Sequence, residues 1–247
     1  MRFITLLTDY HYKDFYLGKV KSRILRCFSE HRLLDICHGV DSFDLLQTSY
    51  AFNGMRSEFS SDDIHFIFVK LHYDKNFKIL IAKTKNHGII VVANNGILGL
   101  LNIELEKIYE LPVNKGSFVE LSLIEQISQI DFSILKECET PFFLKRPEPR
   151  ITEKEIRGEI MLIDQYGNCI SNIHQSVFEP FVQNSIYEIC FRREKILSLS
   201  DDYSDNREAG AVAIFNEQGW LEIASVEGNG SKLFGLGSQS KISVKKN

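Results

Sequence analysis

The segment Phe3-Ile4-Thr5-Leu6-Leu7-Thr8-Asp9 is a short apolar run of extended type that ends in a carboxylate. Apolar side chains then recur at spacings of three and four residues from near Asp14 to Phe28, which predicts an amphipathic helix. A second extended run, Arg32 to Ile36, follows it. A strand, a helix and a strand in this order predict a parallel strand pair, because a parallel connection needs a crossover of this length.

The alternation of strands and helices continues to about residue 140. Further strands are predicted at 64–69, 79–82 and 89–93, and further helices after Phe43 and from 117 or 118 to 130. We therefore expect an N-terminal α/β domain over residues 1–140 with a largely parallel central sheet. Ligands of such sheets bind at the carboxyl ends of the strands.

The pattern changes after a proline-rich segment. Pro141, Pro147 and Pro149 lie close together, and the fixed φ angle and missing N–H of proline oppose regular structure, so residues 141–155 are predicted as a linker. Short extended segments separated by turn residues follow, at 159–163, 169–173, 186–191, 211–215, 220–225 and 241–244. We expect a smaller all-β domain over residues 156–247.

Composition narrows the class of partner. The chain has 247 residues and a net charge of −4, which favours neither a nucleic acid nor an anionic membrane, so a small molecule is the expected partner. Five scattered cysteines form no CxxC and seven histidines form no HxxxH or HExxH, so neither a metal site nor a bound cofactor is expected. The opening apolar run is too short for a signal peptide, and we expect a cytoplasmic protein.

Two local features can carry chemistry, and each has two interpretations. Asp164, Tyr166 and Asn168 lie in one strand-turn-strand segment, where they either bind a ligand or only satisfy the backbone of a β-turn. Asp9 ends the first predicted strand, where it either holds the hydroxyls of a ribose or caps the helix that begins near Asp14. The sequence alone leaves both pairs open.

Several motifs together resemble the S-adenosylmethionine (SAM) hydroxide adenosyltransferases, which form adenosine from SAM and are related to the fluorinases and chlorinases. The family patterns are TDF with KDxYxGxxKG, VDITHxxxPFD, PDNG, IDxFGNxxTNI and FNSxGxLEIAxxxGN. Their counterparts here are Thr8-Asp9-Tyr10 with Lys13 to Lys21, Leu34 to Asp44, Asn94-Asn95-Gly96, Ile163 to Ile173 and Phe215 to Asn229. Their order and spacing extend over both predicted domains.

The resemblance implies a barrel-like C-terminal domain and a homotrimer whose sites lie between neighbouring subunits. SAM or adenosine is the implied ligand. By matched position, Asp9 holds the ribose hydroxyls, Asp164 the methionine ammonium and Asn168 the adenine edge. Phe43 and Tyr166 form apolar walls, and the last motif adds Asn216 to the substrate-binding set. The implied reaction is displacement of methionine from the ribose 5′ carbon by water, and the sulfonium leaves as a neutral thioether.

The chain departs from the family where water is handled. The family patterns DPGVGSxR and HGRD correspond to segments that place Lys70, Phe77 and Lys115 at the Asp, Arg and His positions. Glu217-Gln218 stands where the family has a serine that helps to hold the methionine carboxylate. Adenosine recognition is therefore better preserved than methionine recognition.

Two hypotheses follow from these departures. In the first, the chain is a SAM hydrolase in which His72 and Asp74 replace the lost groups as catalytic residues. In the second, it is an inactive SAM- or adenosine-binding protein with a sensor or assembly role. Two ammonium groups near a sulfonium weaken SAM binding unless they are neutral or paired, and an anionic ligand such as a phosphorylated nucleoside is a further option.

Overall fold

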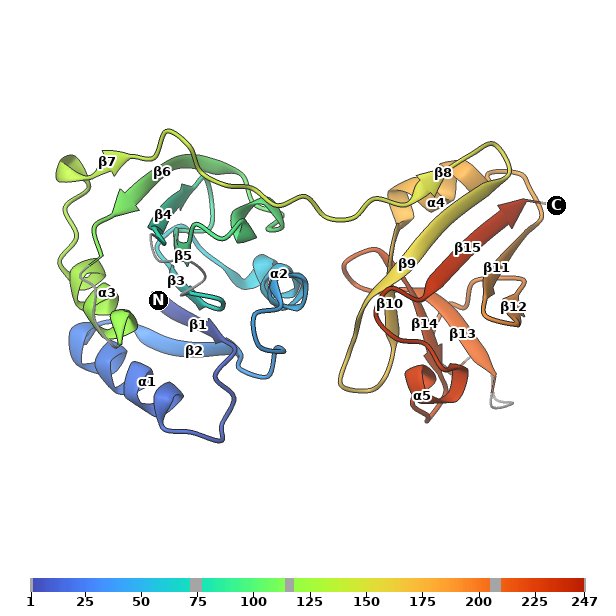
Figure 1. The fold of residues 1–247 in the computed structure, drawn as a ribbon, viewed down its shortest axis with the longest axis horizontal. Coiled ribbons are helices and arrows are strands. Elements are labelled where there is room, and N and C mark those ends of the chain that lie inside the picture. Colours follow the sequence, from blue (N-terminus) through green and yellow to red (C-terminus); the bar gives the residue numbers. More distant parts are fainter. Residues whose placement is uncertain (1, 72–76, 114–117, 205–209, 247) are drawn as a thin grey trace. The chain divides into compact units, whose positions relative to one another are not determined.

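The computed structural model describes residues 2–71, 77–113, 118–204 and 210–246. The chain forms two compact units, Met1–Arg146 and Pro147–Asn247 (Figure 1). The boundary between the two units lies inside the proline-rich segment.

A seven-stranded mixed sheet forms the centre of the first unit, in the order β2-β1-β3-β5-β4-β6-β7. The first four strands in this order pair in parallel, and the others are antiparallel. Their bounds are β1 Phe3–Thr8, β2 Arg32–Cys37, β3 Ile64–Phe68, β4 Ile79–Thr84, β5 Ile89–Ala93, β6 Leu105–Leu111 and β7 Lys136–Glu137.

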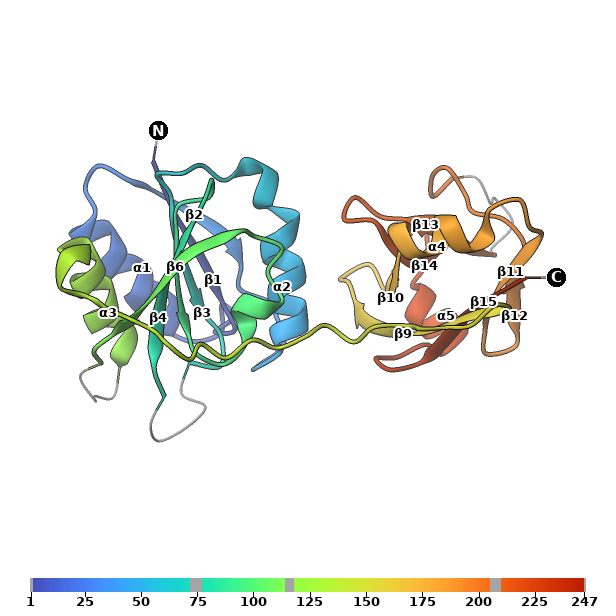
Figure 2. The same ribbon diagram turned by 90° about the horizontal axis from the view of Figure 1, so that it is seen from above.

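Helices cover both faces of this sheet (Figure 2). Helices α1 (Tyr16–Cys27) and α3 (Val119–Ser128) pack side by side on one face, and α2 (Leu45–Gly54) packs on the other. Short 3-10 turns occur at Arg56–Glu58, Ile97–Gly99 and Phe132–Ile134. Because β1 pairs with both β2 and β3 while α1 and α2 lie on opposite faces, the strand order reverses between β1 and β3. This is the position at which open α/β sheets bind ligands.

The predicted α/β architecture of the first unit is confirmed, with three differences of detail. Strands β6 and β7 were not predicted from the sequence. Helix α1 begins at Tyr16 rather than near Asp14. The sheet also continues beyond its parallel part, because only residues 85–88 separate β4 from β5, and so short a connection allows only an antiparallel pair. Gly88 makes this turn possible, since it has a φ of +74° and a Cβ there would lie 2.0 Å from the Asp63 carbonyl oxygen.

The second unit is built on an eight-stranded antiparallel sheet in the order β12-β11-β15-β9-β10-β14-β13, with β8 paired to β9. The edge strands β12 and β13 contact each other, so the sheet curls into a barrel-like form (Figure 1). Its strands are β8 Arg150–Ile151, β9 Glu155–Ile163, β10 Cys169–His174, β11 Tyr187–Phe191, β12 Glu194–Ile196, β13 Ala211–Phe215, β14 Trp220–Ser225 and β15 Lys241–Lys246.

The predicted β architecture of this unit is confirmed, and the structure adds two short helices. Helix α4 (Gln175–Val182) contains Pro180, and α5 (Gly230–Phe234) spans only five residues between glycines. Neither segment is long enough to show a helical period, which explains why the sequence did not predict them. No helix in the described ranges has the length and apolar character needed to cross a membrane.

The first part of the proline-rich segment packs on the first unit. Phe142 donates its N–H to the Asn94 side chain at 2.7 Å, and Leu144 donates to the Gly96 carbonyl oxygen at 3.0 Å. A Cβ at Gly96, which has a φ of +98°, would lie 2.4 Å from the Leu144 side chain. The Asn94-Asn95-Gly96 motif therefore serves as a docking point for the segment that leaves this unit.

Buried His65 makes stability depend on pH. Its ring contacts Thr5 Oγ1 at 2.8 Å and the His87 carbonyl oxygen at 2.7 Å, and burial lowers its pKa to about 4. Below the ordinary histidine pKa of about 6.5 the unfolded chain binds a proton that the folded chain does not, so stability falls as the pH falls towards 4. We predict that His65 removes about 2 kcal/mol of unfolding free energy between about pH 7.5 and about pH 5.

Urea unfolding at the two pH values measures this loss. His65→Gln keeps a donor towards His87 but does not titrate, so the pH-dependent loss is smaller in this variant by His65's share. An equal loss in both proteins would contradict the prediction.

Candidate functional site

Asp9 lies at the carboxyl end of β1, at the reversal of strand order. Its Oδ2 accepts the Phe43 N–H at 2.9 Å, and its Oδ1 has no hydrogen-bond partner in the described parts of the chain. The helix-cap interpretation of Asp9 is wrong, because Phe15 occupies the N-cap of α1 and no side chain caps that helix. Within the described residues, Asp9 therefore uses one carboxylate oxygen to order a loop and leaves the other without a hydrogen bond.

Two carboxylates, those of Asp9 and Asp44, accept backbone N–H groups at and just after Phe43. Its backbone has a φ of +70°, and its side chain is 66% exposed. The next residue, Asp44, caps α2 by accepting the N–H groups of Leu46 and Gln47 at 2.8 and 3.0 Å. An apolar ring left in solvent at a strand-end site offers a flat surface to a ligand, so the structure brings together two of the residues chosen from sequence.

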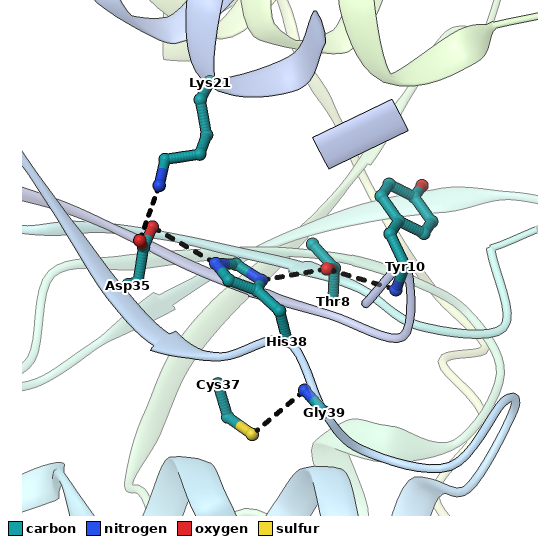
Figure 3. A network of polar contacts seen from close by, with 7 residues as sticks. All are labelled: Thr8, Tyr10, Lys21, Asp35, Cys37, His38 and Gly39. Carbon is teal, nitrogen blue, oxygen red and sulfur yellow. Dashed lines mark hydrogen bonds and ion pairs between the residues drawn. The ribbon is translucent and has the colours of Figure 1, made fainter. Parts of the chain in front are cut away.

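A chain of polar contacts lies under this loop (Figure 3). Lys21 Nζ is 2.6 Å from Asp35 Oδ2, and Asp35 Oδ1 is 3.2 Å from His38 Nε2. His38 Nδ1 is 2.9 Å from Thr8 Oγ1, which also accepts the Tyr10 N–H at 3.3 Å. His38 stands at the histidine of the VDITHxxxPFD pattern, but it was not among the site residues chosen from sequence.

The position after β3 is also part of this edge. Lys70 is half-buried with a φ of +50°, and Asn95 Nδ2 donates to the carbonyl oxygens of Val69 and Lys70 at 3.1 and 3.3 Å. Phe77 packs against the core on the α1 side of the sheet. The proposed catalytic pair His72 and Asp74, and also Lys115, lie outside the described residues.

A tyrosine–glutamate pair adjoins Asp9. Tyr10 donates its hydroxyl to Glu120 Oε1, and Glu120 is only 5% exposed. Burial, followed by the Glu120 charge, raises the pKa of Tyr10 well above its ordinary value. The hydroxyl departs from the family pattern TDF, which has phenylalanine in this place. That replacement was the one signal that could have drawn attention to Glu120.

In the second unit, Asp164 orders the turn between β9 and β10. Its Oδ1 accepts the N–H groups of Tyr166 and Asn168, both at 2.9 Å, and its Oδ2 accepts the Asn168 side-chain N–H at 3.0 Å. Gly167 has a φ of +88°, and a Cβ there would lie 2.2 Å from the Asn229 side chain. The β-turn interpretation of these residues is therefore correct for their own contacts.

The same turn forms one wall of a pocket of about 860 Å³. Tyr166, whose side chain is 69% exposed, is part of this wall. The pocket is lined by Asp164, Gln165, Tyr166, Asn168, Tyr203, Ser204, Ser225, Val226, Glu227, Gly228 and Asn229. A volume of this size accommodates a nucleoside or an amino acid.

Behind the pocket lies a buried acidic residue. Tyr203 donates its hydroxyl to Glu222 Oε1 at 2.7 Å, and Asn216 Nδ2 donates to Glu222 Oε2 at 3.3 Å. Glu222 is 2% exposed, and burial raises its pKa. Burial also raises the pKa of the neighbouring Cys169 thiol to about 12. The Glu222 carboxyl group is therefore shielded from solvent by the residues around it.

Asn216 occupies a different place from the other sequence-predicted residues. Its Oδ1 accepts the N–H groups of Gln218 and Trp220, both at 3.1 Å, and so closes the β13–β14 hairpin. It is not among the pocket-lining residues and adjoins them through Glu222. Within the described ranges, no group of three or more His, Cys, Asp and Glu side chains is placed to hold a metal ion.

Comparison with known proteins assigns the family. The model of the SAM hydroxide adenosyltransferase N-terminal domain matches residues 4–127, and that of the C-terminal domain matches residues 158–243. The chain belongs to the SAM hydroxide adenosyltransferase family. The motifs that led to this family from sequence lie within both matched regions.

Three similar proteins match this chain over nearly its full length. An (R)-S-adenosyl-L-methionine hydrolase from Methanocaldococcus jannaschii is 21% identical, and the match covers 98% of this chain and 95% of that protein. Among solved structures, an uncharacterized conserved protein from Thermotoga maritima has a TM-score of 0.85 at 20% identity, covering 98% of this chain and 99% of that one. A conserved hypothetical protein from Thermus thermophilus has a TM-score of 0.77 at 18% identity, with complete coverage of both chains.

Asp9 and Asn168 are predicted to bind a nucleoside. Asp9→Ala and Asn168→Ala should each weaken adenosine binding about tenfold or more, because each removes hydrogen-bonding groups that a bound nucleoside leaves unpaired. Titration calorimetry with adenosine measures the loss. Asp9→Asn keeps an acceptor for the Phe43 N–H, and so separates loss of the charge from disorder of the loop.

Asp131→Ala is the matched control, because Asp131 also accepts a backbone N–H, from Ser133, but at the turn that follows α3. Unchanged adenosine affinity in both Asp9→Ala and Asn168→Ala would remove these two residues from the site.

Proposed function

We propose that this protein hydrolyses SAM to adenosine and methionine. The observation that carries the proposal is the match of both family domains along one chain, together with an acidic strand-end site in the first unit and an open pocket in the second. The name of the M. jannaschii relative supports the same reaction.

The proposed binding roles follow the chemistry of each group. Asp9 accepts hydrogen bonds from the ribose hydroxyls, for which its Oδ1 is suited, and Asn168 both donates to and accepts from the adenine edge. Asp164 holds the methionine ammonium through its charge. The exposed rings of Phe43 and Tyr166 cover the apolar faces of the ligand.

Asn216 is assigned an indirect part in binding. It holds Glu222 behind the pocket and closes the neighbouring hairpin. We propose that it keeps the pocket wall in place.

The proposed reaction is a single displacement. Water attacks the 5′ carbon of the ribose, a carbon–oxygen bond forms, and the carbon–sulfur bond breaks with its electron pair returning to sulfur. Methionine leaves as a neutral thioether, so the leaving group needs no proton. The water must lose one proton. We propose that His72 and Asp74 orient the water and accept that proton. The enzyme needs no cofactor in this scheme.

A second function is favoured by the residues at the family's water-handling positions. Lys70 replaces an acid and Phe77 replaces an arginine, and an ammonium group near a sulfonium opposes SAM binding. Neither residue has the chemistry of the group it replaces. The chain would then bind SAM or adenosine without turnover and act as a sensor or an assembly partner.

Incubation with SAM separates the two functions. We expect purified protein to form adenosine and methionine in equal amounts, above the rate of a protein-free blank, with adenosine measured by chromatography. Added chloride or fluoride tests for 5′-halo-adenosine and so identifies the nucleophile. Binding of SAM or adenosine without product would support the inactive binder, and absence of both binding and product would reject both functions.

The catalytic assignment has its own test. The double variant His72→Ala/Asp74→Asn should lower the rate of adenosine formation at least about a hundredfold, since general-base catalysis typically contributes that much. Its adenosine affinity should be unchanged. A wild-type rate in the double variant would exclude both residues as the water-activating groups.

The homotrimer and the cytoplasmic location remain predictions. Light scattering coupled to size-exclusion chromatography tests the first, with about three times the 28.5 kDa chain mass as the expected result.

A further inference from the structure

We infer that His38 is a positioning residue that fixes Asp9 and Phe43 for nucleoside binding, and that it acts through Thr8. The inference rests on the proposed function, because it concerns the same site. His38 itself touches no ligand: its side chain is completely buried below the loop that carries Phe43.

The contacts of His38 surround Asp9 in the sequence. Thr8 Oγ1 lies 2.9 Å from His38 Nδ1 and accepts the Tyr10 N–H, while the His38 carbonyl oxygen accepts the His11 N–H at 2.9 Å. The His38 side chain therefore anchors the residue before Asp9, while its backbone, which any residue at this position keeps, holds His11. Since Asp9 Oδ2 holds the Phe43 N–H, the position of the loop depends on this anchor.

The polarity of the chain assigns one state to His38 (Figure 3). The negative charge of Asp35 favours a proton on the nearer ring nitrogen, so His38 Nε2 carries the proton. This nitrogen lies 3.2 Å from Asp35 Oδ1 without the alignment of a hydrogen bond. In the neutral ring Nδ1 is then an acceptor, and Thr8 donates its hydroxyl to it. The Tyr10 N–H thus donates to Thr8 Oγ1, and the Thr8 hydroxyl donates to His38 Nδ1. On the other side of the ring, Lys21 donates to Asp35.

The charged and aromatic groups around His38 agree with a neutral ring. Burial lowers the pKa of His38 and outweighs the opposing effect of Asp35, while Lys21 acts in the same direction as burial. Burial acts to raise the pKa of Asp35, but the hydrogen bond from Lys21 and the nearby His38 ring outweigh it and lower that pKa. The Tyr12 ring closes the remaining side, edge to face, at 5.6 Å between centroids.

Protonation of His38 reverses the contact with Thr8. Nδ1 then becomes a donor, so Thr8 Oγ1 must accept from both the ring and the Tyr10 N–H, and its own proton loses its acceptor. Thr8 is completely buried, so water cannot replace that acceptor. The strand end that carries Asp9 is therefore held well by the neutral ring and poorly by the charged ring.

Amide hydrogen exchange tests the anchor without any ligand. We expect the Phe43 and Tyr10 amides to exchange at least about tenfold faster in His38→Ala than in the wild type, because the anchored loop opens more often. His38→Asn should restore most of the protection, since its side-chain oxygen can stand at the Nδ1 position and accept from Thr8. His31→Asn, at the opposite end of β2, is the matched control and should exchange as the wild type does.

Adenosine calorimetry against pH tests the link to binding. Wild-type affinity should fall about fivefold or more as His38 becomes protonated below neutral pH, whereas His38→Asn should keep near wild-type affinity with no such fall. His38→Ala should bind about tenfold more weakly at every pH. A purely structural role would not give the pH dependence or its loss in the asparagine variant.

Two results would overturn the inference: wild-type amide protection in His38→Ala, or a His38→Asn variant that loses as much protection as His38→Ala. A wild-type protein that does not bind adenosine would instead reject the proposed site, and amide exchange would still decide whether His38 anchors Phe43. SAM turnover decides the proposed function separately.

Discussion

The parallel pairing of β1 with both β2 and β3 is the constraint on which the first unit depends. Because α1 and α2 cross on opposite faces, the strand ends at Asp9, His38 and Lys70 meet at one edge of the sheet. A carboxylate placed there is held by the sheet rather than by a mobile loop. The same edge therefore supplies both rigidity and access, which a binding site requires together.

Several polar groups at this edge of the sheet form hydrogen bonds with one another rather than with solvent. The buried hydroxyl of Thr8 pairs with His38 Nδ1, and Asp9 and Asp44 accept backbone N–H groups at the two ends of the loop between them. The buried Thr8–His38 pairing avoids the cost of about 1–3 kcal/mol that a buried unpaired group carries. Local stability and site geometry are thus maintained by the same contacts.

The second unit uses one turn for two purposes. Asp164 closes the turn between β9 and β10 through its own backbone and side-chain partners, and the turn so formed is a wall of the pocket. Structural and binding interpretations of such a residue do not compete. The geometry that satisfies the backbone is also what presents the Tyr166 ring and the Asn168 amide to the pocket.

The sequence by itself determined the alternation of strands and helices in the first unit, the change to β structure after the prolines, and the family motifs that contain Asp9, Phe43, Asp164 and Asn168. These features are local, since periodicity and turn residues act over a few positions. Only the tertiary structure decided the antiparallel extension of the first sheet, the pairing of Tyr10 with Glu120, and the contact of Thr8 with His38. Those contacts join residues 30 to 110 positions apart, and no local pattern specifies which distant side chains packing will bring together.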